Sequence, residues 1–220
     1  MITNLYIYAK MLALLTSIFC LKRLPKTPLV YFFPYLAIIV TIEWMGIFAR
    51  LAGVLSLSNQ LGNLTTVLEF CFFYFLFYRV IKKESFRKVM MVLAVVYLLS
   101  CVTNIFFLWG SYGPHFQTVL PGTIIIIIFV FMYFYYAVEN NEPIDLIRAP
   151  MFWISMGIFL VAVCDFTFNL MHPFLIRNHL LREQYFFLVI NRNLIIFEYL
   201  CFSVALIICS KKNMVRKQRM

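Results

Sequence analysis

Charged residues are scarce in this chain: only 13% of its 220 residues are Asp, Glu, Lys or Arg, and it has just 7 glycines and 6 cysteines. Hydrophobic residues make up 64% of the chain and aromatic residues 19%, and the mean hydropathy is +0.90. A soluble domain of this size has too little interior to bury so much apolar surface. The composition therefore indicates an integral membrane protein.

Cysteine motifs are also missing. All six cysteines fall inside apolar runs, and no CxxC or Cys/His spacing is present. This pattern predicts neither a zinc site nor a disulfide framework, and it favours cysteine in the role of a small buried hydrophobe. No cofactor is expected.

Seven apolar segments are each close to the ~20 residues that a helix needs to cross the hydrocarbon core. The first is expected to be a span, because it lacks the basic region and cleavage site of a signal peptide. Helices are required, since lipid cannot satisfy backbone hydrogen bonds and the segments lack the alternation of barrel strands. We predict an all-α, polytopic membrane protein with seven transmembrane helices, at about 4–21, 29–49, 62–80, 89–109, 118–138, 151–171 and 185–209.

The basic residues predict the orientation. They cluster between the first and second spans, between the third and fourth, and after the seventh, and they are few in the alternate loops. Because Lys and Arg mark cytoplasmic loops, we expect the N-terminus outside and the C-terminus in the cytoplasm. The net charge of +10 is thereby explained without nucleic acid. We expect a transmembrane domain at 1–210 and a basic cytoplasmic tail at 211–220.

Polar residues interrupt several of these spans. The last span has Asn191, Arg192 and Asn193 near its outer end and Glu198 near its middle. An ionised side chain that faces lipid costs roughly 2.5–3.5 kcal/mol, so these groups should face inward and pair. At about 1.5 Å per residue, nearly all of them lie in the outer half of the bilayer. The candidate cluster comprises Lys10, Glu43, Asn63, Glu69, Asn104, Asp165, Asn169, Asn191, Arg192, Asn193 and Glu198.

Arg192 is expected at the centre of this cluster. Its salt-bridge partner should be Glu43, Glu69 or Asp165. The cluster has more carboxylates than cations, which are Lys10 and Arg192. Either some carboxylates are protonated, or the cavity is hydrated, or a ligand cation completes the balance. The cluster has three possible roles: hydrogen bonds and salt bridges that fix helix register, a ligand pocket open to the outside, or a proton or ion pathway.

Two short stretches are similar to known proteins. They are Asn63 with Glu69 and Phe70 in the third span, and residues 152–154 with Gly157 in the sixth. With the seven-helix topology of the whole chain, they resemble compact seven-helix bacterial membrane proteins of unassigned function, some of which resemble sensing modules associated with histidine kinases. The resemblance implies a multi-pass protein of the bacterial inner membrane. Since the sequence has no kinase domain, a sensory role requires a separate output partner in the cytoplasm or the membrane.

Three functions follow from these observations. The first is a sensor or receptor-like module that binds an unidentified ligand in the outer polar cluster. The second is a small transporter or channel for solutes or ions, which the lack of broken helices and repeats disfavours. The third is an intramembrane enzyme acting on lipid, for which Asp165 and His172 are the only near candidates. No nucleophile–base–oxyanion set accompanies them, so an enzyme is disfavoured. Beyond an output partner, only membrane lipid is expected as a partner.

Overall fold

The computed structural model of this chain describes residues 5–24, 27–104, 116–139 and 147–218. Within these ranges the chain is all-helical, which confirms the predicted all-α class. The elements are α1 (Leu5–Leu21), a 3-10 helix η2 (Pro28–Tyr31), α2 (Phe32–Leu51), α3 (Leu55–Val80), α4 (Glu84–Thr103), α5 (Phe116–Glu139), α6 (Pro150–Arg177) and α7 (Leu181–Gln218).

The helices have the length and composition of membrane spans. From η2 and α2 to α7, six helical segments of the described residues are long and apolar enough to cross a bilayer. Helix α1 is shorter, with 17 residues, and at about 1.5 Å per residue it lies at the short end of the range for a span. The chain is therefore a multi-pass membrane protein. The direction in which it crosses the membrane stays a prediction.

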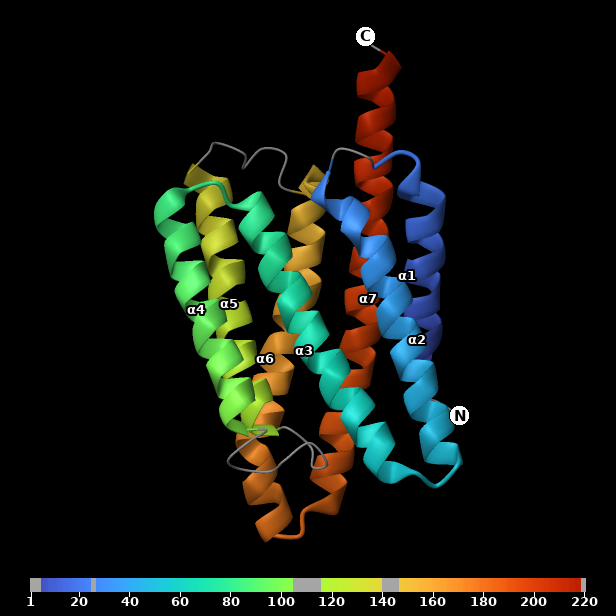
Figure 1. Cartoon of the computed structure of the whole chain (residues 1–220), viewed down its shortest axis with the longest axis vertical. Helices are drawn as coiled ribbons and strands as arrows, with labels where there is room; N and C mark the ends of the chain where they lie inside the picture. Colours follow the sequence, from blue (N-terminus) through green and yellow to red (C-terminus); the bar gives the residue numbers. More distant parts are fainter. Residues whose placement is uncertain (1–4, 25–26, 105–115, 140–146, 219–220) are drawn as a thin grey trace.

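The helices run alternately up and down, so that the two ends of the chain lie at opposite ends of the bundle (Figure 1). We call one end the basic end. It holds the connections that follow α1 and α3, with Lys22, Arg23, Lys82 and Lys83, and the part of α7 that extends beyond the bundle. The α2–α3 and α6–α7 turns lie at the opposite end.

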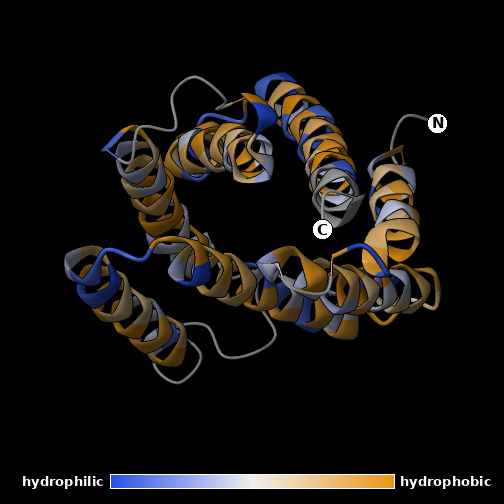
Figure 2. Cartoon of the chain, turned by 90° about the horizontal axis from the view of Figure 1, so that it is seen from above, coloured by the Kyte–Doolittle hydropathy of each residue, from blue (hydrophilic) through white to orange (hydrophobic). Residues whose placement is uncertain are grey.

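Helix α7 makes two of the most extensive helix–helix contacts in the bundle. It packs most extensively on α6 and also on α1, while α2 packs on α3 and α5 packs on α6. Helix α4 touches only the neighbouring α3 and α5 to any extent. Helix α4 therefore lies at the margin of the bundle. The helices consist mainly of apolar residues (Figure 2), and many of their large apolar side chains are exposed. These exposed side chains are suited to lipid.

Aromatic side chains fill the bundle on the side of the basic end. Phe32, Phe77, Phe129 and Phe202 come from α2, α3, α5 and α7 and are fully buried. The rings of Phe32 and Phe202 meet edge to face at 5.3 Å, and those of Phe77 and Phe129 at 6.3 Å. Such pairs add stability beyond the area they bury. The Phe73 ring of α3 also lies 6.0 Å from that of Phe202, so the aromatic layer connects four helices.

At the basic end, one ion pair ties α4 to α5. The Lys83 ammonium donates hydrogen bonds to both carboxylate oxygens of Glu139, at 2.8 and 2.7 Å. The hydrogen bond with Glu139 raises the pKa of Lys83. Both side chains are partly exposed to solvent, so the pair adds little to stability.

Several helices extend past their predicted limits. Helix α3 begins at Leu55 instead of residue 62, and α6 ends at Arg177 instead of residue 171. Helix α7 continues to Gln218, through most of the predicted tail at 211–220. Hydropathy marks the part of a helix in hydrocarbon, whereas the backbone hydrogen bonds can continue in the polar interface. The end of the predicted 89–109 span lies outside the described residues.

Two glycines allow close contacts between helices. A Cβ atom at Gly122 would lie 2.6 Å from the Phe70 ring and 2.9 Å from the Tyr97 ring. A Cβ atom at Gly157 would lie 3.1 Å from the Cα atom of Glu198. Such small residues let membrane helices approach closely and gain van der Waals contact.

We predict that Gly122→Ala destabilises the protein by about 1–3 kcal/mol, because the added methyl group overpacks the α3–α4–α5 contact. The matched control is Gly62→Ala on α3, where a Cβ atom would meet nothing within 4 Å. This control should be neutral or slightly stabilising, because alanine is the better helix former. Thermal unfolding of the purified protein measures both. Equal melting temperatures for the two variants would contradict the packing argument.

Candidate functional site

Lys10 is the cation at the centre of the polar residues. It is only 4% exposed, and its ammonium group forms an ion pair with Glu43 of α2 and a longer one with Glu69 of α3, at 3.8 Å. The ammonium also lies 5.0 Å from the centre of the Tyr199 ring, within the range of a cation–π contact. One side chain of α1 thus joins α1 to α2, α3 and α7.

Glu69 has a second partner on α7. The Tyr199 hydroxyl donates a hydrogen bond to its Oε1 atom at 3.3 Å. Glu69 therefore receives contacts from α1 and α7 while it stands on α3. Thr66 stands on the same face, one turn earlier, because residues three apart are neighbours on a helix.

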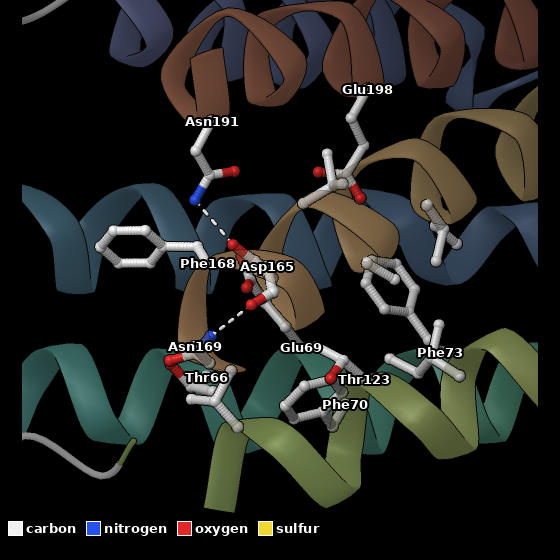
Figure 3. A pocket seen from close by; sticks show the side chains of 15 residues that line it. Thr66, Glu69, Phe70, Phe73, Thr123, Asp165, Phe168, Asn169, Asn191 and Glu198 are labelled. Atoms are coloured by element: carbon white, nitrogen blue, oxygen red, sulfur yellow. Dashed lines mark hydrogen bonds between the residues drawn. The ribbon is translucent and has the colours of Figure 1, made fainter. Parts of the chain in front are cut away.

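Asp165 links α6 to α7. The Asn191 side-chain amide donates a hydrogen bond to its Oδ1 atom at 2.6 Å. The Asn169 amide donates to the backbone oxygen of Asp165 at 2.7 Å. Figure 3 shows both amides directed at Asp165, with Asn191 reaching it from α7. The carboxylate of Asp165 is thus held by one neutral donor, the Asn191 amide.

A cavity of about 270 Å³ lies between α3, α5, α6 and α7. The carboxyl groups of Glu69, Asp165 and Glu198 line it, together with Asn169 and Asn191 (Figure 3). Aromatic and aliphatic residues form the rest of its wall, among them Phe70, Phe73, Phe168, Ile158 and Ala162. A mostly apolar wall with a few convergent polar groups is typical of small-molecule sites.

Glu198 is the most deeply placed carboxylate in this wall. It is 7% exposed, and within the described part of the chain no hydrogen bond or ion pair within 4.0 Å is found for it. The close approach of Gly157 to its backbone leaves α6 and α7 in contact at this level. Its side chain extends from α7 toward the cavity (Figure 3).

A second cavity, of about 290 Å³, lies on the other side of Glu69. Lys10, Glu43, Arg50 and Tyr6 line it, and it shares Glu69 and Thr66 with the first cavity. This second cavity has charges of both signs. The first has carboxylates but no Lys, Arg or His among the described residues of its wall.

The structure brings together most of the predicted cluster in two groups. One consists of Lys10, Glu43 and Glu69, and the other of Asp165, Asn169, Asn191 and Glu198. Asn63 and Asn104 line neither cavity among the described residues. Asn193 is exposed and donates to the backbone oxygen of Val189 at 3.0 Å.

The predicted ion pairs of Arg192 are wrong. Among the ion pairs of the described residues, Lys10 and not Arg192 meets Glu43 and Glu69. Successive residues on an α-helix are about 100° apart around its axis. Since Asn191 faces Asp165, Arg192 is turned away from the first cavity, and it is not among the residues that line it.

Some site residues were not identified from the sequence. Thr66, Thr123 and Phe70 line the first cavity, and Tyr199 contacts both Lys10 and Glu69. Thr66 could have been found from its spacing of three residues to Glu69. The position of Tyr199 next to Glu198 did not indicate that it belongs to the site, because adjacent residues on a helix face different directions.

No known protein family, no curated protein and no solved structure matches this chain. The function must therefore be inferred from the site.

We predict that Lys10→Met destabilises the protein by about 3–5 kcal/mol, because Glu43 and Glu69 lose the cation that balances them. Arg192→Met, the matched control, should have a much smaller effect, because Arg192 forms no ion pair among the described residues. Adding Glu43→Gln to Lys10→Met should restore part of the loss. Thermal and denaturant unfolding in detergent micelles measures these changes. Equal losses for the Lys10 and Arg192 variants would show that Lys10 is not the central cation.

Proposed function

We propose that this protein is a membrane sensor, a receptor-like module that binds a small ligand in the cavity of Glu69, Asp165 and Glu198. The observation that carries the proposal is the buried Glu198 carboxylate in the wall of a cavity of about 270 Å³. Buried ionisable groups inside a membrane protein are expensive and mark functional sites.

A purely structural role explains only part of the cluster. Lys10 with Glu43, and Asn191 with Asp165, are contacts that hold helices in register. Glu198 makes no such contact among the described residues. A side chain kept only for packing at this position would be apolar, so its carboxylate favours a ligand site.

The packing on the side of the basic end disfavours transport. The buried rings of Phe77, Phe129 and Phe202 follow the cavity residues Phe73, Ile126 and Glu198 by about one turn, in the direction of the basic end. A solute pathway would have to open this aromatic layer, whereas a binding site would not. An enzyme is also less favoured, because His172 contacts Phe168, at 5.3 Å between ring centres, and does not line the cavity.

Helix α7 offers a direct route from the cavity to an output partner. It carries Asn191 and Glu198 in the cavity wall and continues to Gln218, beyond the basic end of the bundle (Figure 1). A small shift of α7 at the cavity therefore moves its extended end. A separate partner at this end would read that movement, in agreement with the sensor proposal.

Filling the cavity should abolish ligand binding. We predict that compounds from a library of small metabolites raise the melting temperature of the wild type but not of Ala162→Phe, whose ring occupies the cavity. Val163→Phe is the matched control, because Val163 is the next residue on α6 and is exposed on the outside. It should respond like the wild type. The proposal fails if no compound stabilises the protein, or if every compound that does so stabilises Ala162→Phe equally.

The output route requires the basic end in the cytoplasm, which single-cysteine labelling tests. We predict that a membrane-impermeant maleimide labels Ser56→Cys in intact cells, and labels Ser85→Cys only after the membrane is permeabilised. Ser56 is exposed near the α2–α3 turn, and Ser85 is exposed at the start of α4. The reverse pattern would place the cavity on the cytoplasmic side and contradict a sensor of external ligands.

A further inference from the structure

We infer that the ligand of the first cavity is a small organic cation, an amine with an apolar body, held by Glu198. This inference rests on the proposed binding function and adds the chemical class of the ligand. It follows from the charges, the hydrogen-bond acceptors and the apolar wall of the cavity, taken in turn.

Acidic side chains outnumber basic ones around the cavity. Its wall has three carboxyl groups and, among its described residues, no basic side chain. The nearest cation, Lys10, is 3.8 Å from Glu69 and is also engaged by Glu43. Asp165 is stabilised by a neutral amide. A positive charge is therefore the complement that this cavity lacks.

The polar groups of the wall offer acceptors to a ligand. The Thr123 hydroxyl donates to the Leu120 carbonyl at 2.8 Å, and the Thr66 hydroxyl donates to the Gly62 carbonyl at 3.1 Å. A hydroxyl has a single proton to donate, so both threonines present only lone pairs to the cavity. The Asn169 and Asn191 amides each donate one of their two protons to Asp165. The matching ligand is rich in donors, as an ammonium group is.

A bare metal ion fits this site poorly. No group of three His, Cys, Asp or Glu side chains in the described residues is placed to hold a metal ion. Calcium needs six to eight oxygen ligands at about 2.3–2.6 Å, which the separated carboxylates do not supply. An extended cation can reach one carboxylate with its charge while its body contacts the rest of the wall.

The rest of the wall suits an apolar body. Phe70 and Phe73 are buried and line the cavity with Phe168 and Ile126. A volume of about 270 Å³ is at the small end of ligand cavities, which favours an amine with one ring or a short chain.

The contacts of Lys10 show how this protein binds an ammonium group of its own. Its ammonium lies between the carboxylates of Glu43 and Glu69 and near the Tyr199 ring, on the other side of Glu69 from the cavity. Carboxylates and aromatic rings thus already hold one ammonium group in this half of the bundle. The first cavity has the same kinds of groups without the lysine.

Three probes of similar shape and different charge test the inference: 2-phenylethylamine, 2-phenylethanol and 3-phenylpropanoate. Binding to the full-length protein in nanodiscs is measured by isothermal titration calorimetry at neutral pH. We expect saturable binding of the amine, and binding at least tenfold weaker for the alcohol and the carboxylate. Glu198→Gln should weaken amine binding at least tenfold. Glu183→Gln, an exposed carboxylate at the start of α7, is the matched control and should leave it unchanged.

The outcomes separate the ligand class from the binding function. Ala162→Phe should abolish amine binding, which distinguishes the cavity from partition of the amine into lipid. Equal or tighter binding of the alcohol or the carboxylate, unchanged amine binding in Glu198→Gln, or no amine binding would overturn the inferred class. If library compounds still stabilise the wild type and not Ala162→Phe, the binding function stands without the class. If they do not, both proposals fail.

Discussion

The ion pair of Lys10 with Glu43 and Glu69 is the interaction on which the polar half of this bundle depends. Helix α1 is the shortest of the seven, and its buried lysine reaches acidic groups on two other helices. Between membrane helices there is little hydrophobic driving force, because lipid is as apolar as the helix faces. A charge that must be balanced therefore specifies where α1 docks. The Tyr199 hydroxyl and ring extend this contact to α7.

Packing in the other half of the bundle complements that constraint. The aromatic layer near the basic end connects α2, α3, α5 and α7 through ring contacts, and its four phenylalanines are among the largest fully buried side chains. Gly122 and Gly157 lie nearer the cavity, where they let helices touch. The bundle thus combines dense packing on one side with a polar, partly hollow region on the other. Helix α7 takes part in both.

The sequence predicted the helical class and six membrane-length helices well, because a bilayer imposes a length and a composition on each helix. It also indicated which polar residues share a depth, since depth follows from counting residues. It could not predict the direction in which each side chain points around its helix. Arg192 and Asn191 differ by one position, yet only Asn191 faces Asp165. That direction depends on how α7 packs on α6 and α1, including the close approach at Gly157.

The cavities were beyond sequence reasoning for the same reason. The sequence of a span does not reveal whether its carboxylate is paired, as that of Glu43 is, or lines a cavity, as that of Glu198 does. Only the placement of neighbouring helices tells the two apart. In this bundle Lys10 is held by Glu43 and Glu69, whereas the described wall of the cavity on the other side of Glu69 has no Lys, Arg or His. A membrane protein that keeps such an imbalance gives up stability at that point. In the proposed sensor, a cationic ligand would recover this stability, and its binding would favour the arrangement of α6 and α7 around it. Because α7 continues past the basic end, that preference can be read outside the membrane.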